Sequence, residues 1–188
     1  YTSQAYLEAL PLLMATGAVL AAAQALRAED GQVSRRWWYL SAAALGITAA
    51  SKYPYLLVLA PILHLMIAGR RRLNWQMVFL YGLVVLGVFW ALNPYLWRDP
   101  ISRLYDSLTF HASYTQSVDV AREAYPWYQP LIWVSSSVPW HPGVFFFFTL
   151  DEVIFWVGTV GIFLEGRRPY LVPWYLVGLA ALLLWPTE

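Results

Sequence analysis

The fold of this chain is decided where its apolar sequence is interrupted, at Asn93-Pro94-Tyr95-Leu96-Trp97-Arg98-Asp99-Pro100. The polar segment that opens there runs to residue 142. It holds four acidic residues, three arginines and two of the three histidines, whereas the sequence on either side is largely apolar. A long polar segment between apolar ones is typical of a loop that a membrane protein exposes to water. We therefore predict that residues 93–142 form an outer loop over a site at one face of a bilayer.

The composition supports this class of protein. The chain has 188 residues, of which 60% are hydrophobic and 12% are charged, and its mean hydropathy is +0.50. Soluble domains carry roughly 25% charged residues, and apolar runs of about 17–25 residues are long enough to cross a bilayer as helices. We predict an all-α polytopic membrane protein with about six transmembrane helices, forming a single module over residues 1–188.

Other classes of protein and site are excluded by the same composition. The net charge is +1 and no basic patch is interleaved with aromatic residues, so no nucleic-acid partner is expected. The absence of cysteine excludes disulfide frameworks and thiolate metal sites. The sequence begins at Tyr1 and its last apolar run stops abruptly before Glu188, so we expect a fragment of a longer protein.

The spans are expected at residues 7–26, 37–50, 55–68, 75–92, 145–164 and 170–185. The second and third share an apolar stretch, 37–68, that is interrupted by Ser51-Lys52-Tyr53-Pro54. One long kinked span and two short spans both fit this stretch. We favour two, because 37–68 is too long for one crossing and Pro54 disfavours helix at Tyr53.

The positions of the basic residues test this count of spans. The turns at 27–36, 70–72 and 167–168 hold eight of the twelve basic residues, as three, three and two. Placing these turns in the cytoplasm satisfies the positive-inside rule with six spans. Alternation then puts Lys52 and residues 93–142 on the opposite side. The predicted location is a multi-pass cell membrane, with the long loop on the extracytoplasmic side.

Within the outer loop, residues 99–116 read as one amphipathic helix. Asp99 suits the N-cap position and Pro100 the first helical position. Apolar residues from Ile101 to Leu108 fall on one face at helical spacing. Such a helix is expected to lie flat in the interface instead of crossing the bilayer.

Lys52 is the only lysine of the chain and lies between two apolar segments. An ionisable group there is costly unless it reaches water or a counter-ion. One interpretation is a cation that binds the phosphate of a membrane-embedded lipid carrier. The other is an anchor whose long side chain extends to the interface. The residue alone leaves both open.

Two features of the outer loop also have a functional and a structural interpretation. His111 lies near the apolar edge of the predicted helix, with Tyr114 beyond it, and a single histidine is more often structural. The segment Tyr125-Pro126-Trp127-Tyr128 offers flat aromatic faces, which suit both sugar stacking and an interfacial belt.

A pair of acids follows the loop, Asp151 and Glu152. Either they face a polar cavity inside a span that starts at Phe145, or the span begins after them. The spacing from His141 to Asp151 matches no metal motif. No cofactor is predicted, and a requirement for a divalent metal is left open.

Four stretches together resemble the GT-C glycosyltransferases, specifically the bacterial relatives of the protein O-mannosyltransferases and aminoarabinose transferases (glycosyltransferase family 39). They are the small-residue helix and turn from Ala42 to Pro54, the segment Asn93-Pro94-Tyr95-Leu96-Trp97, the segment Tyr125-Pro126-Trp127-Tyr128, and the terminal Leu184-Trp185-Pro186-Thr187. The resemblance covers nearly the whole chain, and its order and spacing are more specific than any single stretch.

The resemblance implies a GT-C-like fold and transfer of a sugar from a polyprenyl-phosphate donor to a protein, lipid or glycan acceptor at the outer face. Lys52 matches the family's lysine that is associated with the donor phosphate. With this resemblance in view, the residues predicted to bind substrate are Lys52, Tyr53, Arg98, His111, Tyr114, Trp127 and Tyr128.

One departure from the family concerns the catalytic base. Members carry an acidic base in their first outer loop, which would lie upstream of Tyr1, and Glu8 is a poor substitute because it falls inside a helix. No catalytic residue is therefore assigned, and the fragment alone is expected to be inactive. A polytopic transporter subunit and a non-catalytic membrane scaffold are the alternative functions.

Overall fold

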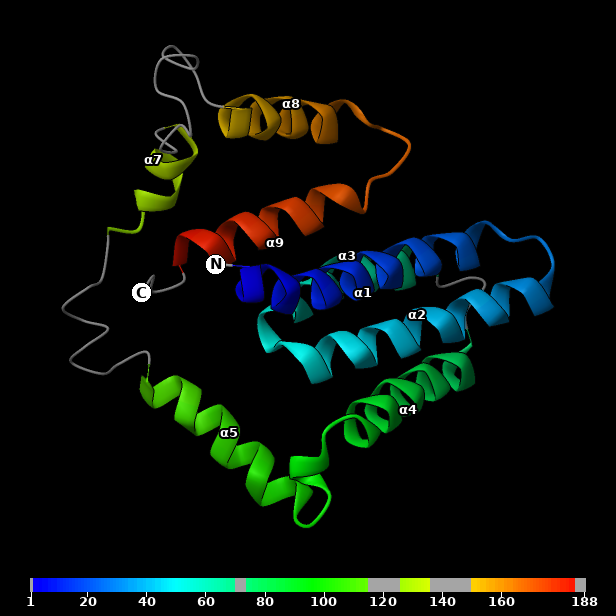
Figure 1. Ribbon diagram of the computed structural model, residues 1–188. Helices are drawn as coiled ribbons and strands as arrows, with labels where there is room; N and C mark the ends of the chain where they lie inside the picture. Colours follow the sequence, from blue (N-terminus) through cyan, green and yellow to red (C-terminus); the bar gives the residue numbers. More distant parts are fainter. Residues whose placement is uncertain (1, 70–73, 115–125, 136–149, 185–188) are drawn as a thin grey trace. The chain divides into compact units, whose positions relative to one another are not determined.

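The computed structural model describes residues 2–69, 74–114, 126–135 and 150–184. Within these ranges every regular element is a helix and no strand occurs (Figure 1). The predicted all-α class is confirmed. The chain forms two compact units, unit 1 (Tyr1–Tyr105) and unit 2 (Asp106–Glu188), which are described in turn.

Unit 1 begins with α1 (Thr2–Arg27) and α2 (Gly31–Ser51), which lie side by side (Figure 1). The predicted polar loop at 27–36 is wrong, because α2 already begins at Gly31. Asp30 causes this early start: its Oδ1 accepts a hydrogen bond from the Gln32 N–H at 2.6 Å, which satisfies a backbone donor that the helix leaves open. The helix has 21 residues, about 31 Å at 1.5 Å per residue, and not the 14 that the apolar run suggested.

The chain reverses direction at Lys52, as the sequence predicted. After α2 it continues as the 3₁₀ helix η1 (Tyr53–Val58), with Pro54 in its first turn, and then as α3 (Leu59–Ala68). Gly69, which follows α3, lies against the side chain of Leu26 near the end of α1. The stretch from 37 to 68 therefore forms separate helices joined at Lys52, and α3 returns toward the end from which α2 started.

The fourth helix of unit 1, α4 (Trp75–Ala91), packs along α2 in the same direction. Ser41 contacts Tyr81, and further along both helices Gly46 lies against Val85 and Val88. Along α1 the order is reversed, since Ser34 contacts Ala25 while Ser41 contacts Ala18. The helices of unit 1 thus alternate in direction: α1 and α3 end where α2 and α4 begin.

The core of unit 1 lies among these helices. Trp38, Leu45 and Ile62 are fully buried there, together with a run of alanines on α1. Ser41 is buried as well, and its hydroxyl donates to the Ala18 carbonyl oxygen at 2.7 Å and lies 3.0 Å from the Tyr81 hydroxyl. Small residues let the helices approach, and this hydroxyl links α1, α2 and α4.

Helix α5 (Pro100–Tyr114) is the predicted helix of the outer loop. It follows the short 3₁₀ helix η2 (Pro94–Leu96). Asp99 caps it as predicted, because its Oδ1 accepts from the Ser102 N–H at 3.2 Å. Ile101, Tyr105 and Leu108 on one face are 83%, 67% and 51% exposed, which leaves an apolar face uncovered. Residues 115–116 of the predicted helix lie outside the described ranges.

Unit 2 contains α7 (Gln129–Ser135), α8 (Leu150–Leu164) and α9 (Leu171–Leu184). The predicted start of a span at Phe145 lies outside the described residues. Asp151 and Glu152 fall in the first described turn of α8. The turn between α8 and α9 contains the basic pair Arg167 and Arg168.

The lengths of the described helices support only part of the predicted membrane architecture. Among the described residues one helical segment, Ala9–Arg27, has the length and hydropathy for a crossing. Shorter apolar helices run over Tyr53–Ala68, Trp75–Ala91, Glu152–Leu164 and Leu171–Leu184. The structure therefore shows the all-helical class, and the number of membrane spans is proposed below.

Candidate functional site

The turn at Lys52 is shaped by the end of α2 and by Pro54. Lys52 has extended backbone angles, φ −155° and ψ 122°, and its N–H donates to the Thr48 carbonyl oxygen at 3.0 Å. Its own carbonyl oxygen accepts from the Tyr55 N–H at 3.3 Å, which starts η1. Both backbone groups are thus held while the side chain is exposed. The local structure presents a single ammonium group beyond the end of α2.

Tyr53 connects this turn to α4. Its ring is half-buried and packs at a tilt against Phe89, with the ring centroids 6.4 Å apart. Because α2 and α4 run in the same direction, this contact places the Lys52 turn at the end of unit 1 where α4 finishes. The contact between the Tyr53 and Phe89 rings therefore supports the backbone turn from which the Lys52 side chain extends.

The second element at this end is the turn from Asn93 to Trp97, which closes onto α4. The Asn93 carbonyl oxygen accepts from the Leu96 N–H at 3.0 Å, and Leu96 is buried. The indole N–H of Trp97 donates to the Trp90 carbonyl oxygen at 2.9 Å, and the two indole rings stack at a tilt. The indole bond satisfies one of the last carbonyls of α4, and together these contacts fix the direction in which the chain enters α5.

Arg103 fixes the start of α5 to the same turn. Its guanidinium donates to the Tyr95 carbonyl oxygen at 2.6 Å and lies 4.9 Å from the centre of the Tyr95 ring. Arg98, one of the predicted substrate-binding residues, is exposed in the loop between these two residues. The turn therefore holds the Arg103 side chain in place and leaves the Arg98 side chain exposed to solvent.

Of the predicted substrate-binding residues, Lys52, Tyr53 and Arg98 lie at this one end of unit 1. The others belong to unit 2: His111 and Tyr114 are on α5, and their side chains lie outside the described set. Trp127 and Tyr128, just before α7, are exposed, and their rings meet edge to face at 5.8 Å. The two aromatic faces are thus accessible, as stacking on a sugar would require.

Sequence reasoning missed the partners that hold these residues. Phe89 and Trp90 lie within an apolar run and carry no sign of a role. Trp97 was noticed as part of a stretch that resembles the family, and Arg103 was expected to pair with Asp106, whereas the structure places its guanidinium on Tyr95. The prolines around this contact were the available signal. Pro94 precedes Tyr95 and Pro100 lies between Tyr95 and Arg103, and prolines mark turns, which can bring such residues together.

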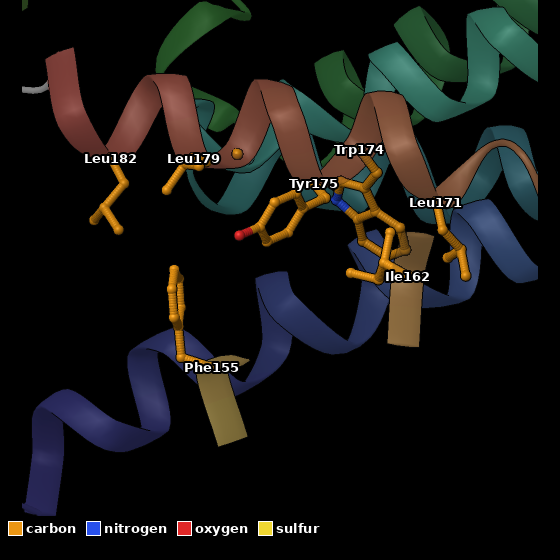
Figure 2. Close-up of a pocket in the computed structure, with 8 residues that line it drawn as sticks. Phe155, Ile162, Leu171, Trp174, Tyr175, Leu179 and Leu182 are labelled. Carbon is orange, nitrogen blue, oxygen red and sulfur yellow. The ribbon is translucent and has the colours of Figure 1, made fainter. Parts of the chain in front are cut away.

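Unit 2 contains a groove between α8 and α9 that the sequence did not indicate (Figure 2). Its volume is about 420 Å³. Phe155 and Ile162 of α8 face Trp174, Tyr175 and Leu179 of α9 across it, so its lining is almost wholly apolar. The groove is therefore open and apolar.

A polar pair formed by Tyr175 of the lining and Thr159 lies beside the groove. The Thr159 hydroxyl lies 2.8 Å from the Tyr175 hydroxyl, and it also donates to the Phe155 carbonyl oxygen at 2.7 Å. The bond joins α8 to α9 at the side of the groove. Hydroxyl groups of this kind link helices in apolar surroundings.

The described part of the chain shows no cluster of side chains that could bind a divalent metal. No cluster of three or more histidine, aspartate or glutamate side chains occurs there. The side chain of Glu8, the residue considered as a substitute for the family's catalytic base, lies outside the described set. Whether the protein requires a divalent metal is therefore left for experiment.

The chain matches none of the protein families, curated proteins and solved structures with which it was compared.

Proposed function

We propose that this protein is a membrane-embedded glycosyltransferase that moves a sugar from a polyprenyl-phosphate donor to a protein, lipid or glycan acceptor. The proposal rests on the end of unit 1 that carries Lys52. There the exposed Lys52 ammonium group, next to the Tyr53–Phe89 ring pair, lies at the same end as the turn from Asn93 to Trp97. A cation beside aromatic rings, at the end of apolar helices, suits a phosphate on a hydrocarbon carrier.

The proposal includes six crossings: α1, α2, η1 with α3, α4, α8 and α9. The alternating directions of the first four segments support it, because each crossing must reverse the chain. Arg27, Arg35 and Arg36 gather where α1 ends and α2 begins, while Lys52 lies at the other end. By the positive-inside rule the arginine end is cytoplasmic and the Lys52 end is outside.

The exposed apolar face of α5 and the groove of unit 2 agree with this assignment. A helix with Ile101 and Tyr105 uncovered on one face is suited to lie in the interface. The apolar groove between α8 and α9 offers a lining that a polyprenyl chain can contact along its length.

Binding of undecaprenyl phosphate in detergent micelles tests the proposal, and it needs no knowledge of the sugar or of the catalytic base. We expect Lys52→Ala to weaken this binding about tenfold, because a hydrogen bond to a charged group contributes roughly 1.5–3 kcal/mol. Lys52→Arg keeps the charge and should keep most of the affinity. Thermal unfolding of each variant, followed by circular dichroism, checks that the fold is intact.

The matched control is Arg167→Ala, which removes the same charge from the exposed turn between α8 and α9. Its affinity for undecaprenyl phosphate should equal that of the unaltered protein. Equal losses in both variants would mean that net charge alone attracts the lipid. Unchanged binding by a folded Lys52→Ala variant would remove the lysine from the site and favour the scaffold or transporter function.

A further inference from the structure

A second site lies at the opposite end of unit 1, where α2 and α4 begin. A cavity of about 220 Å³ opens between the two helices. It is lined by Arg35, Tyr39, Asn74, Gln76, Met77 and Leu80. No acidic residue is among them. Since a water molecule takes up about 30 Å³ in the liquid, the cavity has room for a group the size of phosphate.

Arg35 supplies the positive charge of this cavity. It lies one turn before Tyr39 on α2, so the two side chains share a face of the helix. Its Nε donates to the Gly31 carbonyl oxygen at 3.2 Å, which steadies the guanidinium. Arg35 forms no ion pair with any described residue. A guanidinium has five N–H donors and matches phosphate oxygens in geometry, so this side chain suits an anionic ligand.

The start of α4 adds backbone donors from the other side of the cavity. Asn74 caps the helix, with its Oδ1 accepting from the Met77 N–H at 2.8 Å and its carbonyl oxygen from the Val78 N–H at 3.2 Å. The N–H groups of Trp75 and Gln76 have no acceptor in the described part of the chain. The positive end of the helix dipole points the same way and favours an anion.

Aromatic residues set the level of the cavity relative to a bilayer. Trp37 on α2 is 39% exposed, and Trp75 on α4 is 88% exposed at the same end. Exposed tryptophans of membrane proteins gather at the headgroup level. Met77 and Leu80 extend the lining of the cavity toward the apolar part of the helices. The lining of the cavity therefore combines a basic residue and polar residues with apolar ones, like the boundary between headgroups and acyl chains.

We propose that this cavity binds the phosphate of an anionic phospholipid headgroup in the cytoplasmic leaflet, held between Arg35, Gln76 and the first N–H groups of α4. The proposal rests on the membrane placement described under the proposed function, and not on the donor site. Basic pockets between transmembrane helices on the cytoplasmic side bind such headgroups, and each arginine near an anionic surface contributes about fivefold in affinity.

Native mass spectrometry of the detergent-solubilised protein tests the site, with phosphatidylglycerol and, in a parallel sample, phosphatidylcholine as added lipid. We expect phosphatidylglycerol to be retained in preference. Arg35→Gln should lower its occupancy more than tenfold, because it removes charge-assisted hydrogen bonds as well as a charge. The control is Arg36→Gln, which removes the same charge from an exposed neighbour that does not line the cavity, and it should lower the occupancy by no more than the roughly fivefold that any arginine near an anionic surface contributes. Gln76→Ala gives a second, milder probe of the same cavity.

Three outcomes overturn the proposal. Equal losses in the two arginine variants would show a diffuse attraction instead of a site. Displacement of the lipid by inorganic phosphate at matched concentration would show that a soluble anion is the ligand. Retention of phosphatidylcholine equal to that of phosphatidylglycerol would exclude recognition of charge. Binding of undecaprenyl phosphate by Arg35→Gln, measured in parallel, separates failure here from failure of the site at Lys52.

Discussion

The two units bring helices together by the same kind of hydrogen bond in different surroundings. In unit 1 the hydroxyl groups of Ser41 and Tyr81 lie 3.0 Å apart and are buried. In unit 2 those of Thr159 and Tyr175 lie 2.8 Å apart, but both side chains are half-buried at the side of an open groove. The two hydrogen bonds have similar lengths, so the two pairs differ mainly in how deeply they are buried.

The surroundings follow from the size of the neighbouring residues. Around Ser41, small residues allow backbones to approach, and Trp38 and Leu45 fill the remaining space. Helix α9 has no buried residue, and large side chains hold it away from α8 along the groove. Unit 1 is thus organised by tight packing, whereas the α8–α9 pair leaves an open groove between its helices.

The most disruptive change should be Gly46→Leu, which adds a side chain where α2 lies against the backbone of α4. A Cβ at this position would lie 2.8 Å from the Val85 carbonyl oxygen and 2.8 Å from the Val88 Cβ. Because backbone cannot yield as a flexible side chain does, α4 must shift away from α2. We expect a loss of about 3 kcal/mol in the free energy of unfolding, measured by thermal or detergent-induced unfolding with circular dichroism.

The matched control is Gly87→Leu on α4, where a Cβ would have nothing within 4 Å. Both changes remove a glycine from a helix and so gain the same helix propensity, about 1 kcal/mol. Only the variant at Gly46 should therefore unfold more easily. Similar stability of the two variants would show that the approach of α2 and α4 does not hold unit 1 together.

Sequence reasoning reached the features that depend on neighbours along the chain. The Asp99 cap, the reversal at Lys52 and the extents of α4 and α9 all follow from local patterns of proline, polar and apolar residues. The early start of α2 is also a local feature. It was missed because Arg35 and Arg36 are as typical of a loop as of a helix, and the capping role of Asp30 went unnoticed beside them.

Features that depend on residues far apart in sequence were out of reach. The contact of Ser41 with Tyr81 joins positions 40 apart, and a serine in an alanine-rich helix carries no sign of its partner. The α8–α9 groove exists because large side chains such as Phe155 and Trp174 face one another. Which faces meet is decided by tertiary packing, and periodicity does not contain that information.

A smaller effect is expected from Ser41→Ala, which removes the polar link of unit 1 without changing its packing. The Tyr81 hydroxyl would be left buried without this partner, at a cost of about 1–2 kcal/mol. Measured together with Tyr81→Phe and the double variant, the coupling between the two residues should be about 1 kcal/mol. Additive effects of the two single changes would mean that the hydroxyls do not stabilise one another.

The smallest effect is expected at the corresponding pair of unit 2, where Thr159→Val preserves the shape of the side chain and removes its hydroxyl. Tyr175 borders an open groove, so its hydroxyl can find other partners when Thr159 is lost. The coupling from Thr159→Val, Tyr175→Phe and the double variant should stay below about 0.6 kcal/mol, the average for hydrogen bonds between membrane helices. A coupling as large as that of Ser41 with Tyr81 would show that burial does not set the strength of these bonds, and the contrast between the two units would then lie only in the packing around Gly46.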